Sequence, residues 1–239
     1  MKIEIIKCLK DNFSYLLINE KNSDACVVDP GEAKPVLKFI EKNKINLKYI
    51  LNTHHHGDHI GGNNTLKNKF SAKILASEND RERIPEIDIF LSDGQIWKDD
   101  IFEFKVISVP GHTMGHICFY FFNEKIVFTG DTLFSLGCGR VFEGSNEDMF
   151  NSLTKLKSLP PVTKVYFGHE YTLNNSIFCS KFDENNSELD RKIIDIKKKL
   201  NNGLPTVPSS IKDELDCNIF LRAKTLKEFS KLRDLKDNF

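Results

Sequence analysis

Short apolar runs, rich in β-branched and aromatic residues, alternate with turn residues along the first two thirds of the chain. Runs of this kind predict β-strands. We expect strands at residues 3–6, 15–18, 25–28, 49–52, 73–76, 102–109, 117–122, 126–129 and 164–167. We expect helices between them at residues 35–42, 63–68 and 146–157, the last after the capping pattern Ser145-x-x-Asp148. Strands and helices interleaved in this way predict packed layers of both.

The pattern changes after His169. Asn, Lys and Glu become more frequent, and apolar positions recur at the 3.6-residue spacing of a helix. Helices are expected at residues 173–182, 187–200 and 210–215. We therefore predict two domains: residues 1–169, which mix strands and helices, and residues 170–239, which are helical.

Charge and composition exclude several classes of partner. The 239 residues contain 34 Lys and Arg against 34 Asp and Glu, and 40% of them are hydrophobic, which is typical of a globular protein. A nucleic-acid module would show a basic excess, and a protein of membrane surfaces a basic amphipathic face. The longest stretch without a charged residue, 106–123, is interrupted by proline and glycines. We expect neither a nucleic-acid nor a membrane partner.

The cysteines and the first residues bear on the compartment. Six cysteines contain no CxxC pair, so neither a zinc ribbon nor a redox motif is indicated, and we expect reduced thiols. Charged residues interrupt the first twenty positions, where a secretory signal would have its apolar segment. The expected location is cytoplasmic.

Histidines are concentrated directly after the strand expected at 49–52. Residues 53–62 read Thr-His-His-His-Gly-Asp-His-Ile-Gly-Gly. In an extended chain side chains alternate, so His55 faces away from three candidate ligands that share one side: His54, His56 and Asp58. His59 follows where the chain turns toward a helix expected to start near Gly61. Three imidazoles and a carboxylate within six positions could bind two adjacent metal ions.

A histidine-rich tract that binds metal adventitiously is the alternative interpretation. It would not predict partners elsewhere in the chain, and three are present, each after an expected strand. They are His112 in Val-Pro-Gly-His, Asp131 in Phe-Thr-Gly-Asp and His169 in Tyr-Phe-Gly-His. The glycine before each allows the backbone to approach a crowded centre closely.

Together these residues resemble the metallo-β-lactamase superfamily, whose H-x-H-x-D-H signature matches the tract in order. The resemblance implies an α/β (α+β) fold, a four-layer αββα sandwich with a metal site at one edge of its two sheets. It implies one metal ion held by His54, His56 and His112, and a second held by Asp58, His59 and His169. Asp131 would bridge both ions. His116 lies outside this set, and we assign it a structural role.

Three further segments look like glyoxalase II, the hydroxyacylglutathione hydrolases: residues 129–144, residues 168–172 and the tail that ends Arg-Asp-Leu-Lys at 236. In that family basic residues from the loop after the bridging aspartate and from the C-terminal helix hold the glycine carboxylate of glutathione. Those positions carry Arg140, Arg233 and Lys236. Tyr171 matches a tyrosine that contacts the tripeptide, whereas Phe142 stands where many relatives carry tyrosine. A solvated face on a lysine-rich helix is the alternative interpretation of the tail.

The resemblance implies hydrolysis of S-D-lactoylglutathione to glutathione and D-lactate, the second step of methylglyoxal detoxification. A hydroxide that bridges the metal ions would attack the thioester carbonyl, oriented by Asp58. Zinc is the first expectation for both ions, and iron or manganese would also suit these nitrogen and oxygen ligands. We expect a monomer that acts on this small-molecule thioester.

Two alternatives come from other classes. One is another hydrolase of the superfamily, or a persulfide dioxygenase with a single iron, neither of which would need the three basic residues at positions 140, 233 and 236. The other is a member that binds metal without catalysis, and the full set of seven ligands argues against it.

Overall fold

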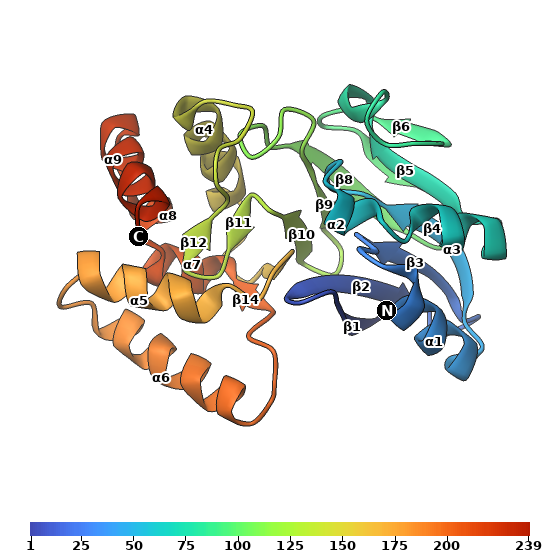
Figure 1. Cartoon of the computed structure of the whole chain (residues 1–239), viewed down its shortest axis with the longest axis horizontal. Helices are drawn as coiled ribbons and strands as arrows, with labels where there is room; N and C mark the ends of the chain where they lie inside the picture. The colour runs from blue at the N-terminus through green and yellow to red at the C-terminus, as the bar shows by residue number, and fades with distance from the viewer. The chain divides into compact units, whose positions relative to one another are not determined.

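The computed structural model describes all 239 residues, which form two compact units. The N-terminal unit comprises Met1–Ser108 and Gly115–Glu124, and the C-terminal unit comprises Val109–Met114 and Lys125–Phe239. Figure 1 colours the chain from blue at the N-terminus to red at the C-terminus. The division predicted from the sequence, at residues 169 and 170, stays a prediction.

A six-stranded sheet organises the N-terminal unit, in the order β1-β2-β3-β4-β5-β6 (Figure 1, blue to teal). Its strands are Lys2–Cys8, Asn12–Ile18, Asp24–Val28, Asn46–Leu51, Lys73–Ser77 and Ile89–Leu91. The first three strands pair antiparallel, whereas β3 to β6 pair parallel. Parallel neighbours need crossover connections, and helices supply two of them. They are α1 (Ala33–Asn43), and α2 (Gly57–Ile60) with α3 (Asn63–Phe70).

Apolar side chains of α1 and α3 bury one side of this sheet. Val36, Ile40 and Leu66 share a core cluster with Leu16 and Ile50 of the strands. Strands β7 (Ile96–Lys98), β8 (Glu103–Ser108) and β9 (Ile117–Phe121) run antiparallel in that order. They contact the sheet where Tyr49 of β4 packs against Trp97 of β7, with ring centroids 5.0 Å apart.

The C-terminal unit combines short strands with most of the helices. Its strand order is β14-β13-β10, with β10 and β13 parallel. The strands are Ile126–Gly130 (β10), Leu133–Phe134 (β11), Gly137–Cys138 (β12), Lys164–Phe167 (β13) and Ser209–Ser210 (β14). The helices are Asn146–Lys157 (α4), Thr172–Phe182 (α5), Ser187–Asn201 (α6), Ile211–Cys217 (α7), Ile219–Arg222 (α8) and Leu226–Asp237 (α9).

Aromatic rings hold the helices of this unit together. Phe178 of α5 stacks on Phe220 of α8 at 5.8 Å, and Phe220 meets Phe229 of α9 at 6.0 Å. Phe229 also contacts Phe150 of α4 at 5.8 Å. All but Phe150 are fully buried, so α9 is anchored by its own apolar face.

Most predicted elements are confirmed. Every expected strand is present, and the Ser145 side chain forms the expected capping box with Asp148 at the start of α4. The strands that the sequence did not indicate are two or three residues long. The helix expected to start near Gly61 is α3, which begins at Asn63, but the sequence did not indicate the single turn of α2 before it, which begins at Gly57. No helix combines the length and the apolar surface that a membrane crossing requires.

Candidate metal centre

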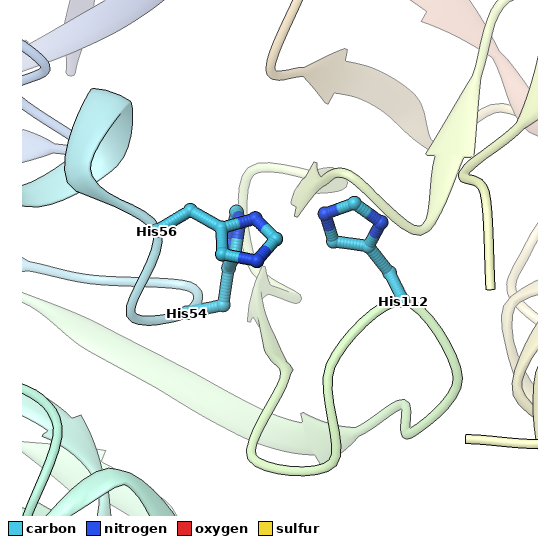
Figure 2. A group of neighbouring side chains, drawn as sticks. All are labelled: His54, His56 and His112. Atoms are coloured by element: carbon cyan, nitrogen blue, oxygen red, sulfur yellow. The ribbon is translucent and has the colours of Figure 1, made fainter. Parts of the chain in front are cut away.

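The histidine tract leaves the sheet where β4 ends. His54 and His56 lie on the connecting loop, and Figure 2 draws both, with ring centroids 4.7 Å apart. Asp58 and His59 instead belong to the single turn of α2. Strand-like alternation therefore does not position Asp58; the helical turn does. That turn sits tightly on its neighbour, because a Cβ added to Gly31 would lie 2.2 Å from the Asp58 carbonyl oxygen.

A buried aspartate orients two of these imidazoles. Asp29, directly after β3, accepts hydrogen bonds from the Thr53 amide at 2.8 Å, from the Thr53 hydroxyl at 2.7 Å and from His59 Nδ1 at 3.0 Å. The Thr53 hydroxyl in turn accepts from His54 Nδ1 at 3.0 Å. A carboxylate can only accept, so the proton sits on Nδ1 and Nε2 of each ring carries the lone pair that a metal takes.

Sequence reasoning missed Asp29. One signal could have found it: an acid that directly follows the apolar strand Ala-Cys-Val-Val, next to β4 in the parallel part of the sheet. Ligand atoms of Asp29, His54 and His59 lie within 4.8 Å of one another. Asn12 was missed as well; its amide donates to Asp58 Oδ2 at 2.8 Å and so fixes that carboxylate.

The two histidines outside the predicted ligand set, His55 and His116, lie beside His54. His116 is buried and stacks on His54 with centroids 4.7 Å apart and planes 16° apart, which is a packing contact. His55 turns toward the buried Asp80, with Nδ1 3.8 Å from Oδ1. Gly115 leaves room for that aspartate, since a Cβ there would lie 2.0 Å from Asp80 Oδ1.

The C-terminal unit contributes the other three predicted ligands. His112 stands on the loop after β8 (Figure 2), and Asp131 and His169 follow β10 and β13. The last two strands are parallel neighbours, so their carboxyl ends share one edge. Asp131 Oδ2 lies 3.5 Å from His112 Nε2 and 3.3 Å from His169 Nε2. The Asp131 carboxylate thus lies close to both imidazoles.

The segment after β12 fixes His112. Its Nδ1 donates to the Arg140 carbonyl at 2.8 Å, which places the proton there and the lone pair on Nε2. The residue before Arg140 has to be glycine, because a Cβ on Gly139 would lie 1.9 Å from the Asp131 carbonyl oxygen and 3.3 Å from His112 Nδ1. Nitrogen and carboxylate donors of this kind suit a divalent metal ion.

The predicted substrate residues all lie in the C-terminal unit, in contrasting settings. The Arg140 side chain is 60% exposed. Tyr171 is partly exposed and stacks on His169, with centroids 4.7 Å apart and planes 5° apart. Arg233 is only 4% exposed, so the interpretation of this part of α9 as a solvated face was wrong. Phe142 is exposed beside His112, with centroids 5.2 Å apart.

The side chains of Arg233 and Lys236 contact other parts of the protein. Arg233 Nη1 donates to the carbonyl oxygens of Cys138 at 3.0 Å and Gly139 at 3.4 Å. The ammonium of Lys236 lies 5.1 Å from the ring centroid of Phe178. Burial lowers the pKa of Lys236, and the neighbouring positive charge of Arg233 lowers it further.

Comparison with known proteins identifies the family of the chain. The family model of the metallo-beta-lactamase superfamily matches residues 11–169, and that of the hydroxyacylglutathione hydrolase C-terminus matches residues 170–239. A hydroxyacylglutathione hydrolase of Pelagibacter ubique (strain HTCC1062) is 59% identical over 239 residues, which is 100% of both chains. One from Methylococcus capsulatus is 41% identical over 225 residues, 94% of this chain and 88% of that one.

Solved structures show the same fold. The crystal structure of the BLEG-1 B3 metallo-beta-lactamase matches with a TM-score of 0.73 at 22% identity, over 93% of this chain and 100% of that one. That of ETHE1 from Myxococcus xanthus matches with a TM-score of 0.75 at 24% identity, over 98% of this chain and 90% of that one. The predicted metallo-β-lactamase fold with a helical C-terminal region is thus confirmed. The chain belongs to the hydroxyacylglutathione hydrolase family of the metallo-beta-lactamase superfamily.

Proposed function

We propose that this protein hydrolyses the thioester bond of 2-hydroxyacylglutathiones, S-D-lactoylglutathione first among them, to glutathione and a 2-hydroxy acid such as D-lactate. The observation that carries the proposal is the 59% identity to a hydroxyacylglutathione hydrolase over the full length of both chains. The match of residues 170–239 to that family's C-terminal region favours it over the other hydrolases and the persulfide dioxygenase.

The metal centre of this proposal has two ions. One would be held by His54, His56 and His112, and the other by Asp58, His59 and His169. Asp131, which lies near His112 and His169, would be the shared ligand. In support, Asp29, Thr53 and the Arg140 carbonyl each hold an Nδ1 so that Nε2 is presented to a metal. Zinc is our first choice, and iron or manganese would fit the same donors. When bound, two divalent ions activate water for attack at neutral pH.

The chain's own residues then position the reactants. Asp58 would accept a hydrogen bond from the attacking water and so orient it; in support, the Asn12 amide holds its carboxylate. The leaving group is a thiol with an ordinary pKa of about 8.5, which departs as thiolate without a strong general acid. No residue therefore has to act as a general acid for the leaving group.

Recognition of the glutathione part falls to the C-terminal unit. Arg140, Arg233 and Lys236 supply positive charge for the glycine carboxylate, and a planar guanidinium suits a carboxylate's two oxygens. Tyr171, held flat against His169, presents its hydroxyl to the tripeptide. We also propose a reducing, cytoplasmic compartment, which the six free and buried cysteines support. The expected oligomeric state is a monomer.

The test is hydrolysis of S-D-lactoylglutathione by the purified protein, with the metal content of the same sample measured. We expect turnover to rise with metal loading and to saturate near two ions per chain. Asp131→Asn should lose metal and activity together, because it removes the charge from the shared carboxylate. A sample with two ions per chain and no turnover of this substrate would refute the proposed function.

A further inference from the structure

A fourth charged residue belongs to the cluster of basic side chains at the end of α9, and it is an acid. Asp237 Oδ1 accepts hydrogen bonds from Arg233 Nη2 at 2.8 Å and from Arg233 Nε at 3.1 Å. The same oxygen lies 3.9 Å from Arg140 Nε. A carboxylate of the protein therefore already binds one of the two arginines that are proposed to bind the carboxylate of the substrate, and it lies near the other.

The hydrogen bonds of Arg233 leave little room for a second carboxylate. A guanidinium has five N–H donors. Nε and one N–H of Nη2 go to Asp237, and Nη1 donates to the carbonyl oxygens of Cys138 and Gly139. At most one N–H remains, on Nη2. Two-pronged binding of an incoming carboxylate to Arg233 thus requires Asp237 to give up its place.

The position of Asp237 on its helix does not itself favour a carboxylate. It is the last residue of α9, and the C-terminal end of a helix carries a partial negative charge that disfavours an anion. The Asp237 side chain is about one quarter exposed, so it can exchange its partner for water. The geometry is that of an internal carboxylate held by the arginines and by little else.

We propose that Asp237 is a specificity-determining residue: it competes with the substrate's carboxylate for Arg233 and Arg140, and the substrate displaces it. The inference rests on the proposed function, because it assumes a glutathione thioester. An anion that offers two oxygens in one plane can replace Asp237 at the guanidinium, whereas a neutral group cannot. Asp237 thereby weakens the binding of ligands that carry this carboxylate and leaves ligands without one unaffected, so it limits how strongly the site prefers a carboxylate.

The experiment compares two variants on two substrates. Asp237→Asn keeps the shape and one acceptor oxygen but removes the competing charge. Asp234→Asn, one turn earlier on the same helix and exposed, removes an equal charge away from the guanidinium and is the matched control. The substrates are S-D-lactoylglutathione and the same thioester with its glycine carboxylate converted to a primary amide.

For Asp237→Asn we expect KM for the carboxylate substrate to fall about threefold to fivefold, as expected for loss of one partly exposed ion pair. KM for the amide substrate and both KM values of Asp234→Asn should stay within about twofold of wild type. An unchanged or raised KM for the carboxylate substrate in folded Asp237→Asn protein would overturn the proposal, since it would mean that Asp237 only steadies Arg233.

A second measurement follows Arg233 in the wild-type protein and so does not depend on the folding of Asp237→Asn. The NMR signal of the Arg233 Nε–H group, assigned with Arg233→Lys, should shift when S-methylglutathione is added and stay in place when its glycine amide is added. An unshifted signal at saturating S-methylglutathione would overturn the proposal. If the wild-type protein turns over neither of the two substrates, the proposed function is refuted, and this inference with it.

Discussion

A buried glutamate supports the segment between Asp131 and the Arg140 carbonyl. Glu214 of α7 is fully buried, and its Oε2 accepts hydrogen bonds from the Leu136 amide at 2.7 Å and from Asn218 Nδ2 at 3.0 Å. Its Oε1 accepts from the Ser209 hydroxyl. Leu136 lies in the turn between β11 and β12, five residues beyond Asp131. We predict that this carboxyl group determines both the stability of the turn and the placement of the metal ligands beside it.

The magnitude follows from the hydrogen bonds. Glu214→Ala deprives the buried Leu136 amide of its acceptor, which costs about 1–3 kcal/mol, and leaves a small cavity. Asn218 loses less, because its amide also donates to the Gly137 carbonyl at 3.0 Å. We expect a loss of about 3–4 kcal/mol in the free energy of unfolding. Glu214→Gln can still accept from Leu136 and turn its amide toward Ser209, so it should stay within about 1 kcal/mol of wild type.

Urea unfolding near neutral pH measures these differences, and the pH dependence provides a second check. Burial raises the pKa of the Glu214 carboxyl above its ordinary value of 4.5, so the folded state binds that proton more tightly than the unfolded chain does. The contribution is full below about pH 4.5 and is lost as the pH rises through the raised pKa. Wild type should therefore lose stability relative to Glu214→Gln between acidic and neutral pH.

Two results would refute this reasoning. If Glu214→Ala costs less than about 1 kcal/mol, the buried amide of Leu136 has found another partner and the carboxylate is dispensable. If Glu214→Gln is as unstable as Glu214→Ala, shape and acceptor number do not explain the effect. Turnover of S-D-lactoylglutathione should fall with stability in the alanine variant and be retained in the glutamine variant.

Three further predictions concern the site and the thiols. Asn in Asp29→Asn tolerates the backbone φ of 48° at this position, but it is a weaker hydrogen-bond acceptor for His59. We expect a 10–100-fold loss of metal affinity with the fold retained. If the variant retains as much metal as wild type during dialysis against a chelator, the prediction is wrong. Tyr171→Phe keeps the stacking on His169 and should raise KM severalfold at constant kcat, whereas an unchanged KM would remove the hydroxyl from substrate binding. Burial is the main cause that raises the pKa of five of the six cysteine thiols, those of Cys8, Cys26, Cys138, Cys179 and Cys217. None of these five should react quickly with a disulfide reagent near pH 8 before the protein unfolds, and one fast thiol among them would disprove this.

The strands could be predicted because apolar runs bounded by turn residues report burial directly. The helix that carries Asp58 and His59 could not, because its single turn is held by contacts across the fold: the Asn52 amide donates to the His59 carbonyl at 3.2 Å, and Gly31 allows close approach. The same holds for Asp29, which acts on His59 from 30 positions earlier in the chain. A local pattern does not contain such a pairing.

The charged tail illustrates a different limit. Arg233 lies in a lysine-rich helix whose composition indicates a solvated surface, yet it is buried. Its acceptors are main-chain carbonyls about 95 residues away in sequence, and every residue type has such a carbonyl. Only the family resemblance singled out this arginine, and neither pattern nor resemblance indicated Asp237 as its partner.

Arg140 holds two separate roles in one residue, and this has an evolutionary consequence. Its carbonyl oxygen fixes the tautomer of His112, while its exposed side chain stands near Asp237 in the basic cluster. Every amino acid has the carbonyl, so a substitution at this position changes the side chain without removing that acceptor. Under the proposed function, a substitution at position 140 would therefore change substrate preference without disturbing His112, so related enzymes could diverge at this position and keep the same reaction.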